Sequence, residues 1–205
     1  MQVEHIEVFV EEPSAEAALR ILLPKIAPQL TASVYNLQSK TNLLAQLPYR
    51  LQGYSRWLQS NQRIVVLIDQ DQNDCSELKS QLEAMAAGAG LVTKTASRTA
   101  AYQVVNRIVV EELEAWFFGD WASVCKAYPR VPTTIPRQAR YRMPDAIPGG
   151  TWEALERVLQ KAGYFGSGLR KIEAARAIAP YMQPEINTSN SFQVFRRTLV
   201  ELISP

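Results

Sequence analysis

Two carboxylates directly follow the most apolar stretch of the chain. Ile64 to Ile68 is a run of apolar, largely β-branched residues, followed by Asp69 and Asp71 and then by Asp74. Such a run is typical of a strand buried on both faces, as in a parallel sheet. Side chains at i and i+2 of an extended segment point the same way, so Asp69 and Asp71 can face one site. Because close carboxylates repel each other and Mg²⁺ is commonly held by one or two of them, this spacing predicts a divalent cation.

Two further groups of acids follow predicted strands. Glu11 and Glu12 end the first strand, and Glu111, Glu112 and Glu114 follow the last one. The carboxyl ends of parallel strands lie at one edge of the sheet, where open α/β sheets bind ligands. Acids at helix N-termini also complement the helix dipole, which explains any single carboxylate well. The helix dipole explains poorly why acids follow three different predicted strands, and this coincidence favours a shared site.

Two lysines are candidates for positive charge at this edge. Lys40 follows a strand-like segment, although a solvated lysine at a helix start explains it equally well. Lys171 could reach over the site from the C-terminal region to meet a phosphate, although a surface lysine is the commoner interpretation. If the segment after Val110 is helical, Glu111 and Glu114 share one face, and the aromatic residues that follow are core.

The elements around these residues alternate between strand and helix up to about Asp120, which favours βαβ units and a parallel sheet. Strands are predicted at Val3–Val10, Ser33–Leu37, the run ending at Asp69, and Val104–Val110. Helices are predicted at Ala15–Leu23, closed by Pro24 and Pro28, at Leu43–Leu58, interrupted or kinked at Pro48 and Gly53, and at Cys75–Ala87. Leu91–Ala96 is expected to be a strand or a loop.

Beyond Asp120 the pattern changes to a proline-rich stretch and then to helices. The helices are predicted at Trp152–Ala162, Leu169–Ala179 and Ser191–Ile203. We therefore expect an α/β core over residues 1–120, with about four parallel strands flanked by helices. A helical C-terminal cap over residues 121–205 is expected to pack on this core as part of a single structural unit.

Composition narrows the classes of function. The net charge of +2 over 205 residues indicates no broad basic surface and no basic stripe, so contact with nucleic acid would be local. His5 is the only histidine, which excludes a site built on several imidazoles. Cys75 and Cys125 have neither metal-ligand spacing nor a disulfide framework. With no signal peptide and no apolar run of membrane-spanning length, a reduced cytoplasmic setting is expected.

Several segments resemble a known family. A strand ending in Glu, then a helix, then a strand ending in Asp-x-Asp is similar to the Toprim pattern of topoisomerases, bacterial primases, recombination mediators and overcoming-lysogenisation-defect nucleases. More closely, the chain resembles a bacterial Toprim-like family catalogued as domain of unknown function 4276. The matching segments are Val10–Ser14, Ser39–Lys40, Leu43–Leu44, Leu47–Pro48, Leu67–Asp71, Arg107–Trp116, Ala127–Pro129, Trp152–Leu155, Lys171 and Ser189–Phe192.

The chain departs from the Toprim pattern at its first motif. That motif is usually Glu-Gly with an acid four residues after the Glu. Here Glu11 is followed by Glu12, and the spacing to Glu16 fits Glu12, whereas Glu11 sits closer to the strand. Both remain candidates for the Toprim glutamate. The family pattern favours glycine before the lysine, where this chain has Ser39.

The resemblance implies a Mg²⁺- or Mn²⁺-dependent nuclease or other phosphotransfer enzyme acting on nucleic acid. The catalytic residues implied are Glu11, Glu12, Asp69, Asp71, Lys40 and Lys171, and the implied metal ligands are Glu11, Asp69, Asp71, Glu112 and Glu114. Related nucleases often work with an ATPase. Because this chain has no Walker A pattern, such an ATPase would be a separate subunit, and a role in phage defence or DNA repair follows by analogy only.

Two other functions fit parts of the sequence. A non-catalytic Toprim-fold binding or regulatory module agrees with the near-neutral charge and the lack of a basic stripe. An aspartate-nucleophile phosphatase using Asp69 and Asp71 fits less well. That chemistry needs a Thr or Ser motif nearby and usually places its Asp-x-Asp on the first strand of the chain.

Overall fold

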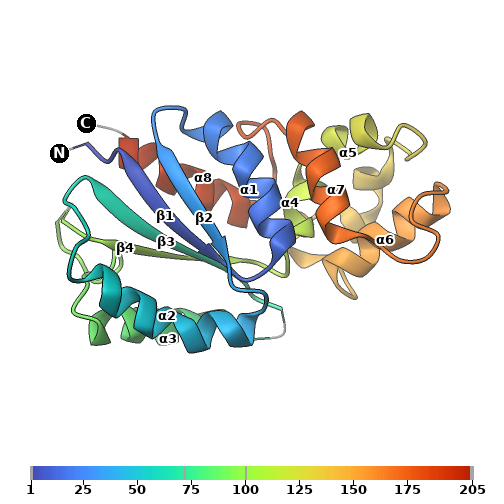
Figure 1. The fold of residues 1–205 in the computed structure, drawn as a ribbon. Coiled ribbons are helices and arrows are strands. Elements are labelled where there is room, and N and C mark those ends of the chain that lie inside the picture. The colour runs from blue at the N-terminus through green and yellow to red at the C-terminus, as the bar shows by residue number, and fades with distance from the viewer. Residues whose placement is uncertain (1, 72, 100, 204–205) are drawn as a thin grey trace.

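The computed structural model describes residues 2–71, 73–99 and 101–203 and contains one parallel sheet covered by helices on both faces (Figure 1). Its strands are β1 (His5–Val10), β2 (Thr31–Asn36), β3 (Gln62–Asp69) and β4 (Val104–Val109), in the order β2-β1-β3-β4. All three neighbouring pairs are parallel, with Val8 beside Val65 and Val66 beside Asn106. The expected α/β fold with about four parallel strands is therefore confirmed.

Helices cover the sheet in two layers because its strands are apolar on both faces. Helices α1 (Pro13–Ile26) and α8 (Asn190–Ile203) lie on one face, and α2 (Lys40–Tyr54) and α3 (Cys75–Gly88) lie on the other (Figure 1). Along β3, Val65 and Leu67 belong to the core under α1, whereas Ile64, Val66 and Ile68 belong to the core under α2 and α3. This alternation explains the uninterrupted apolar run in the sequence.

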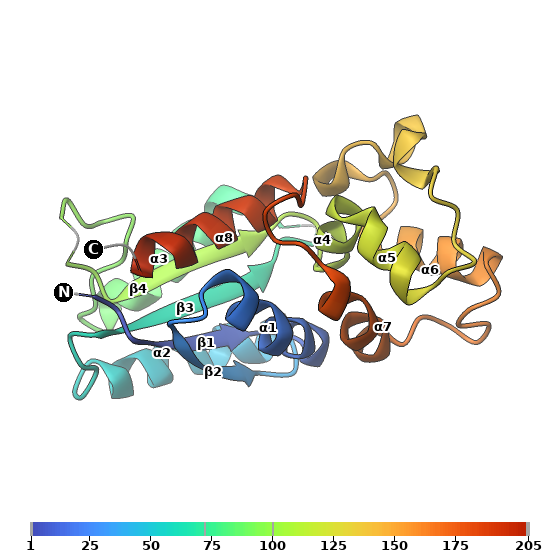
Figure 2. The same cartoon turned by 90° about the horizontal axis from the view of Figure 1, so that it is seen from above.

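The remaining elements lie beyond the carboxyl ends of the strands (Figure 2). They are α4 (Glu114–Gly119), α5 (Trp121–Ala127), α6 (Thr151–Lys161), α7 (Lys171–Ile178) and the short 3₁₀ turns Ile135–Arg137, Ala139–Tyr141, Pro144–Ala146 and Ala179–Tyr181. The chain then returns along the sheet as α8, which contacts β4 and α1. None of the helices in the described ranges combines the length and apolar character needed to cross a bilayer.

Several predicted boundaries are wrong for identifiable reasons. Helix α1 continues through Pro24 to Ile26, because a proline there removes one hydrogen bond while Leu22 and Leu23 stay buried in the core. Helix α2 starts at Lys40, where the Ser39 side chain accepts a hydrogen bond from Asn42 N, and it is continuous as far as Tyr54.

The segments on either side of β4 settle two alternatives that the sequence left open. The segment from Leu91 to Ala96 is a loop with a single bridge between Thr93 and Val104. Glu111 has a φ of 61° and precedes α4, so it does not share a helical face with Glu114. Trp116, by contrast, is fully buried, as expected of a core residue.

Candidate metal centre at the carboxyl edge of the sheet

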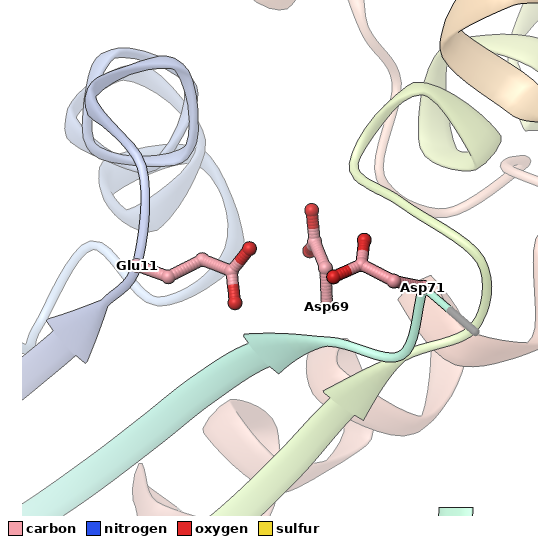
Figure 3. A group of neighbouring side chains, drawn as sticks. All are labelled: Glu11, Asp69 and Asp71. Atoms are coloured by element: carbon pink, nitrogen blue, oxygen red, sulfur yellow. The ribbon is translucent and has the colours of Figure 1, made fainter. Parts of the chain in front are cut away.

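Glu11, Asp69 and Asp71 converge at the carboxyl edge of the sheet (Figure 3). Glu11 follows β1, and the two aspartates end and follow the adjacent strand β3. One carboxylate oxygen from each residue lies within 4.8 Å of the others. Glu11 and Asp69 are buried and Asp71 is exposed, and Glu11 Oε2 has no hydrogen-bond partner in the described part of the chain. Such a set of oxygens suits a hard divalent cation.

The convergence of the two aspartates has a different cause from the one expected. Strand β3 ends at Asp69, and Asp71 has a φ of 49°, in the left-handed region. Its backbone N–H donates to Glu111 O at 2.9 Å, and Glu111 is also left-handed. The turn after β3 is thus held against the turn after β4. This contact orients the Asp71 side chain toward the site, whereas the sequence had suggested that the two-residue period of an extended strand would do so.

Burial and mutual repulsion disfavour the ionised forms of these acids. Burial raises the pKa of Glu11 to about 7, with Lys40 opposing the shift and Asp71 adding to it. Burial, followed by the charges of Glu11 and Glu114, raises the pKa of Asp69 well above its usual value. Asp69 Oδ2 accepts a hydrogen bond from Leu113 N at 3.4 Å. A bound cation would offset the repulsion that this arrangement creates.

These shifts predict that the metal-free protein loses stability as the pH rises. Glu11 and Glu114 have pKa values of about 7, above the usual 4.5, so the folded protein binds more protons than the unfolded chain between these values. We expect the melting temperature in EDTA to fall by on the order of 10 °C between about pH 5 and about pH 8. Saturating Mn²⁺ should remove most of this fall. Identical melting curves at both pH values would contradict the prediction.

Lys40 lies where it was predicted, at the same edge of the sheet. Its ammonium group is 2.6 Å from Asp71 Oδ2, and it donates to Gln70 O at 3.1 Å and to Asn73 Oδ1 at 2.9 Å. It is the first residue of α2. Lys40 therefore balances the exposed carboxylate of the group and places a positive charge beside it.

Lys171 lies among a second set of carboxylates. Its Nζ is 3.5 Å from Glu12 Oε2 and 3.9 Å from Glu112 Oε1, and it lies over the Trp152 ring at 5.6 Å. Burial lowers the pKa of Lys171, but the charges of Glu114, Glu12 and Glu112 outweigh burial and raise it. Burial also raises the pKa of Glu114 to about 7, with Lys171 opposing. Lys171 is thus the counter-charge of this set.

The structure divides the predicted ligands between these two groups. Glu11 joins Asp69 and Asp71, whereas Glu12 contacts Lys171 and accepts a hydrogen bond from Ser14 Oγ at 3.0 Å. Glu112 accepts hydrogen bonds from Trp152 N at 3.0 Å and Thr151 Oγ1 at 3.1 Å, which tie the start of α6 to the sheet edge. Burial raises the pKa of Glu112, and the Trp152 hydrogen bond opposes this shift.

Glu114, which belongs to the set around Lys171, and Asp74 differ in how their carboxylates are satisfied. Glu114 is 1% exposed, and its Oε2 has no hydrogen-bond partner within the described ranges. Asp74 caps α3 by accepting hydrogen bonds from Ser76 N and Glu77 N. Capping of α3 is sufficient to explain an acid at this position, and Asp74 is therefore a suitable control.

An acidic cavity of about 770 Å³ opens beside the group formed by Glu11, Asp69 and Asp71. Its lining residues are Asp71, Asn73, Glu111, Glu112, Gly149, Gly150, Trp152 and Glu153. Sequence reasoning assigned no role to Asn73, Glu153 or the two glycines. Gly150 has a φ of 84°, and a Cβ there would run into the Glu153 carboxylate, so this turn requires glycine. The available signal was the Trp152–Leu155 segment, which belongs to the resemblance described above.

Comparison with known proteins places the chain in a family. The model of the family described as "Domain of unknown function (DUF4276)" matches residues 10–200. The chain belongs to this family. The matched region contains all the carboxylates and both lysines of the two groups described above. No curated protein and no solved structure matches the chain with significant similarity.

Proposed function

We propose that this protein is a Toprim-type, Mg²⁺- or Mn²⁺-dependent phosphotransfer enzyme that hydrolyses phosphodiester bonds in nucleic acid. The observation that carries the proposal is the set of carboxylate oxygens from Glu11, Asp69 and Asp71, which lie within 4.8 Å of one another. Their place beyond the carboxyl ends of parallel strands supports it, because open α/β sheets bind their ligands there. The chain belongs to the DUF4276 family, and the Toprim interpretation comes from the resemblance of its motifs described above.

In this proposal, the residues at the carboxyl edge of the sheet have different roles. Glu11, Asp69 and Asp71 would hold the cation, which when bound activates water and polarises a phosphoryl oxygen. Lys40, beside Asp71, and Lys171, beside Glu12, would bind the non-bridging oxygens of the phosphate as negative charge develops on them. The open cavity next to Asp71 provides room for the nucleic-acid strand on either side of the cleaved phosphodiester bond.

A separate ATPase subunit is part of the proposal through the resemblance alone. The chain has no Gly-x-x-x-x-Gly-Lys-Ser/Thr segment. The substrate would then be presented by the partner, and a role in phage defence or DNA repair would follow by analogy.

We expect the wild-type protein to cleave a labelled oligonucleotide or nick a supercoiled plasmid in Mn²⁺ and to be inactive in EDTA. Glu11→Gln should lower the rate by about 100-fold or more, as expected when a preorganised electrostatic group is lost. Glu77→Gln, an exposed acid on α3, is the matched control and should leave the rate unchanged. Wild-type protein that binds Mn²⁺ and oligonucleotide without cleaving, alone or with a candidate ATPase, would instead support a non-catalytic module.

A further inference from the structure

The small net charge conceals a strong asymmetry along the chain. Residues 1–120 contain ten Lys and Arg against 14 Asp and Glu, whereas residues 121–205 contain 12 against six. Most of the excess falls between Trp121 and Lys161, which we call the basic segment. Its exposed cations are Lys126, Arg130, Arg137, Arg140, Arg142, Arg157 and Lys161. The net charge of the whole chain therefore does not describe the charge of this segment.

The acids of the basic segment do not neutralise its cations. Asp145 accepts hydrogen bonds from Ser189 Oγ and Asn190 N at the start of α8. Glu156 accepts one from Leu169 N at 2.8 Å, and Glu153 faces Gly150 inside the acidic cavity.

None of these three acids is fully exposed. Within residues 2–71, 73–99 and 101–203, none of the seven cations has an ion pair with a carboxylate. The surface of the basic segment is accordingly positive.

Helix α6 connects this surface to the acidic cavity. Glu153, in its first turn, lines the cavity, and Arg157 and Lys161 follow at steps of four residues on the same side of the helix. The distance from Glu153 to Lys161 along the helix is about 12 Å, at 1.5 Å per residue. That length corresponds to about three to four nucleotides at the 3.4 Å spacing of one strand of a duplex.

At the C-terminal end of α6, the last of these side chains belongs to a defined pocket. Lys161 lines a cavity of about 260 Å³ together with Arg130. The Arg130 guanidinium stacks on the Tyr164 ring at 4.3 Å, and its Nη2 donates to Gly163 O at 2.9 Å. Arg130 is thus held in place with part of its charge still exposed, as suits a phosphate-binding position.

We propose that Arg157, Lys161 and Arg130 form a binding track for the phosphate backbone of nucleic acid, leading away from the acidic cavity along α6. This inference rests on the proposed function only for the identity of the polyanion as nucleic acid. Binding of the polyanion to the track requires neither a metal ion nor hydrolysis. Phosphates held there would place the strand so that it enters the cavity beside Asp71. The track also offsets the repulsion that the carboxylates exert on an approaching polyanion.

The test is a binding measurement in EDTA, where hydrolysis is absent. Fluorescence anisotropy would follow a labelled strand of about 20 nucleotides, which exceeds the site size of single-strand binding folds, and the matching duplex. For the double variant Arg157→Gln/Lys161→Gln we expect about tenfold weaker binding. The slope of log affinity against log salt should fall by about 1.4 for the single strand and about 1.8 for the duplex.

The matched control removes the same charge at the opposite edge of the sheet. Arg56 and Arg98 are exposed, follow α2 and precede β4, and Arg56→Gln/Arg98→Gln should leave affinity and slope unchanged. Equal losses in both double variants would overturn the track, and so would wild-type protein that binds anionic vesicles but neither oligonucleotide. Neither result affects the Mn²⁺ site, which a metal titration tests by itself. If the double variant melts early, Arg157→Gln alone provides the same test with half the change in slope.

Discussion

Asp69→Asn is expected to abolish Mn²⁺ binding and, at the same time, to stabilise the metal-free protein above neutral pH. Asp69 is 6% exposed and lies between Glu11 and Asp71, so its charge is central to any cation held there. We expect Mn²⁺ affinity to fall by about 100-fold or more, beyond the 10–100-fold typical of losing an outer-shell partner.

The gain in stability follows from the same repulsion between carboxylates that a bound cation would offset. Burial, then the charges of Glu11 and Glu114, raises the pKa of Asp69, so the folded protein resists its ionisation. A group whose pKa is higher in the folded state costs stability as the pH rises past its unfolded value. Asparagine carries no such charge. The variant should therefore melt above wild type in EDTA at about pH 8, and the difference should become smaller as the pH is lowered and Asp69 takes up a proton.

Calorimetric Mn²⁺ titrations and melting curves in EDTA would measure both effects in one pair of proteins. Asp74→Asn is the control, because asparagine caps a helix as well as aspartate does and Asp74 lies outside the carboxylate group. It should change neither the affinity nor the melting temperature. Unchanged Mn²⁺ affinity in Asp69→Asn would show that the three carboxylates do not form one site.

The part of the site that the sequence predicts is the part carried by strand ends. The apolar run before Asp69 identifies a buried parallel strand, and parallel strands bring their carboxyl ends to one edge, so Glu11 and Asp69 could be expected to meet. The sequence could not distinguish the roles of Glu11 and Glu12, because adjacent residues differ mainly in the direction in which their side chains point. That direction depends on where α1 begins, at Pro13.

The parts that sequence reasoning missed depend on contacts between distant segments. Lys171 meets Glu12 across 159 residues, which no local spacing indicates. Glu153 enters the cavity only because α6 begins against the Glu112 carboxylate. The basic segment was hidden for a simpler reason, since opposite charges in the two parts of the chain nearly cancel in the total. Net charge averages over a chain, whereas binding depends on the local surface.

Lys171→Met is expected to destabilise the protein near neutral pH and to create a second Mn²⁺ site. The variant keeps the apolar stem but leaves Glu12, Glu112 and Glu114 without their shared cation. Removing one partner of a buried ion pair costs about 3–5 kcal/mol, and because the Lys171 side chain is 27% exposed we expect about 2 kcal/mol. The loss should be smaller at about pH 5, where Glu114, whose pKa is about 7, is protonated and needs no counter-charge.

The number of bound metal ions distinguishes this explanation from a purely structural one. If the ammonium group of Lys171 provides positive charge that a second cation would otherwise supply, wild type should bind one Mn²⁺ and Lys171→Met should bind two, with the lost stability restored by the second. Lys126→Met, an exposed lysine on α5, is the control and should bind one. A variant that is destabilised yet still binds one Mn²⁺ would mean that Lys171 acts only on the fold. Two ions in the variant would mean that Lys171 supplies, from α7, positive charge that a second cation would otherwise supply. The position of that helix would then be a condition for the proposed activity.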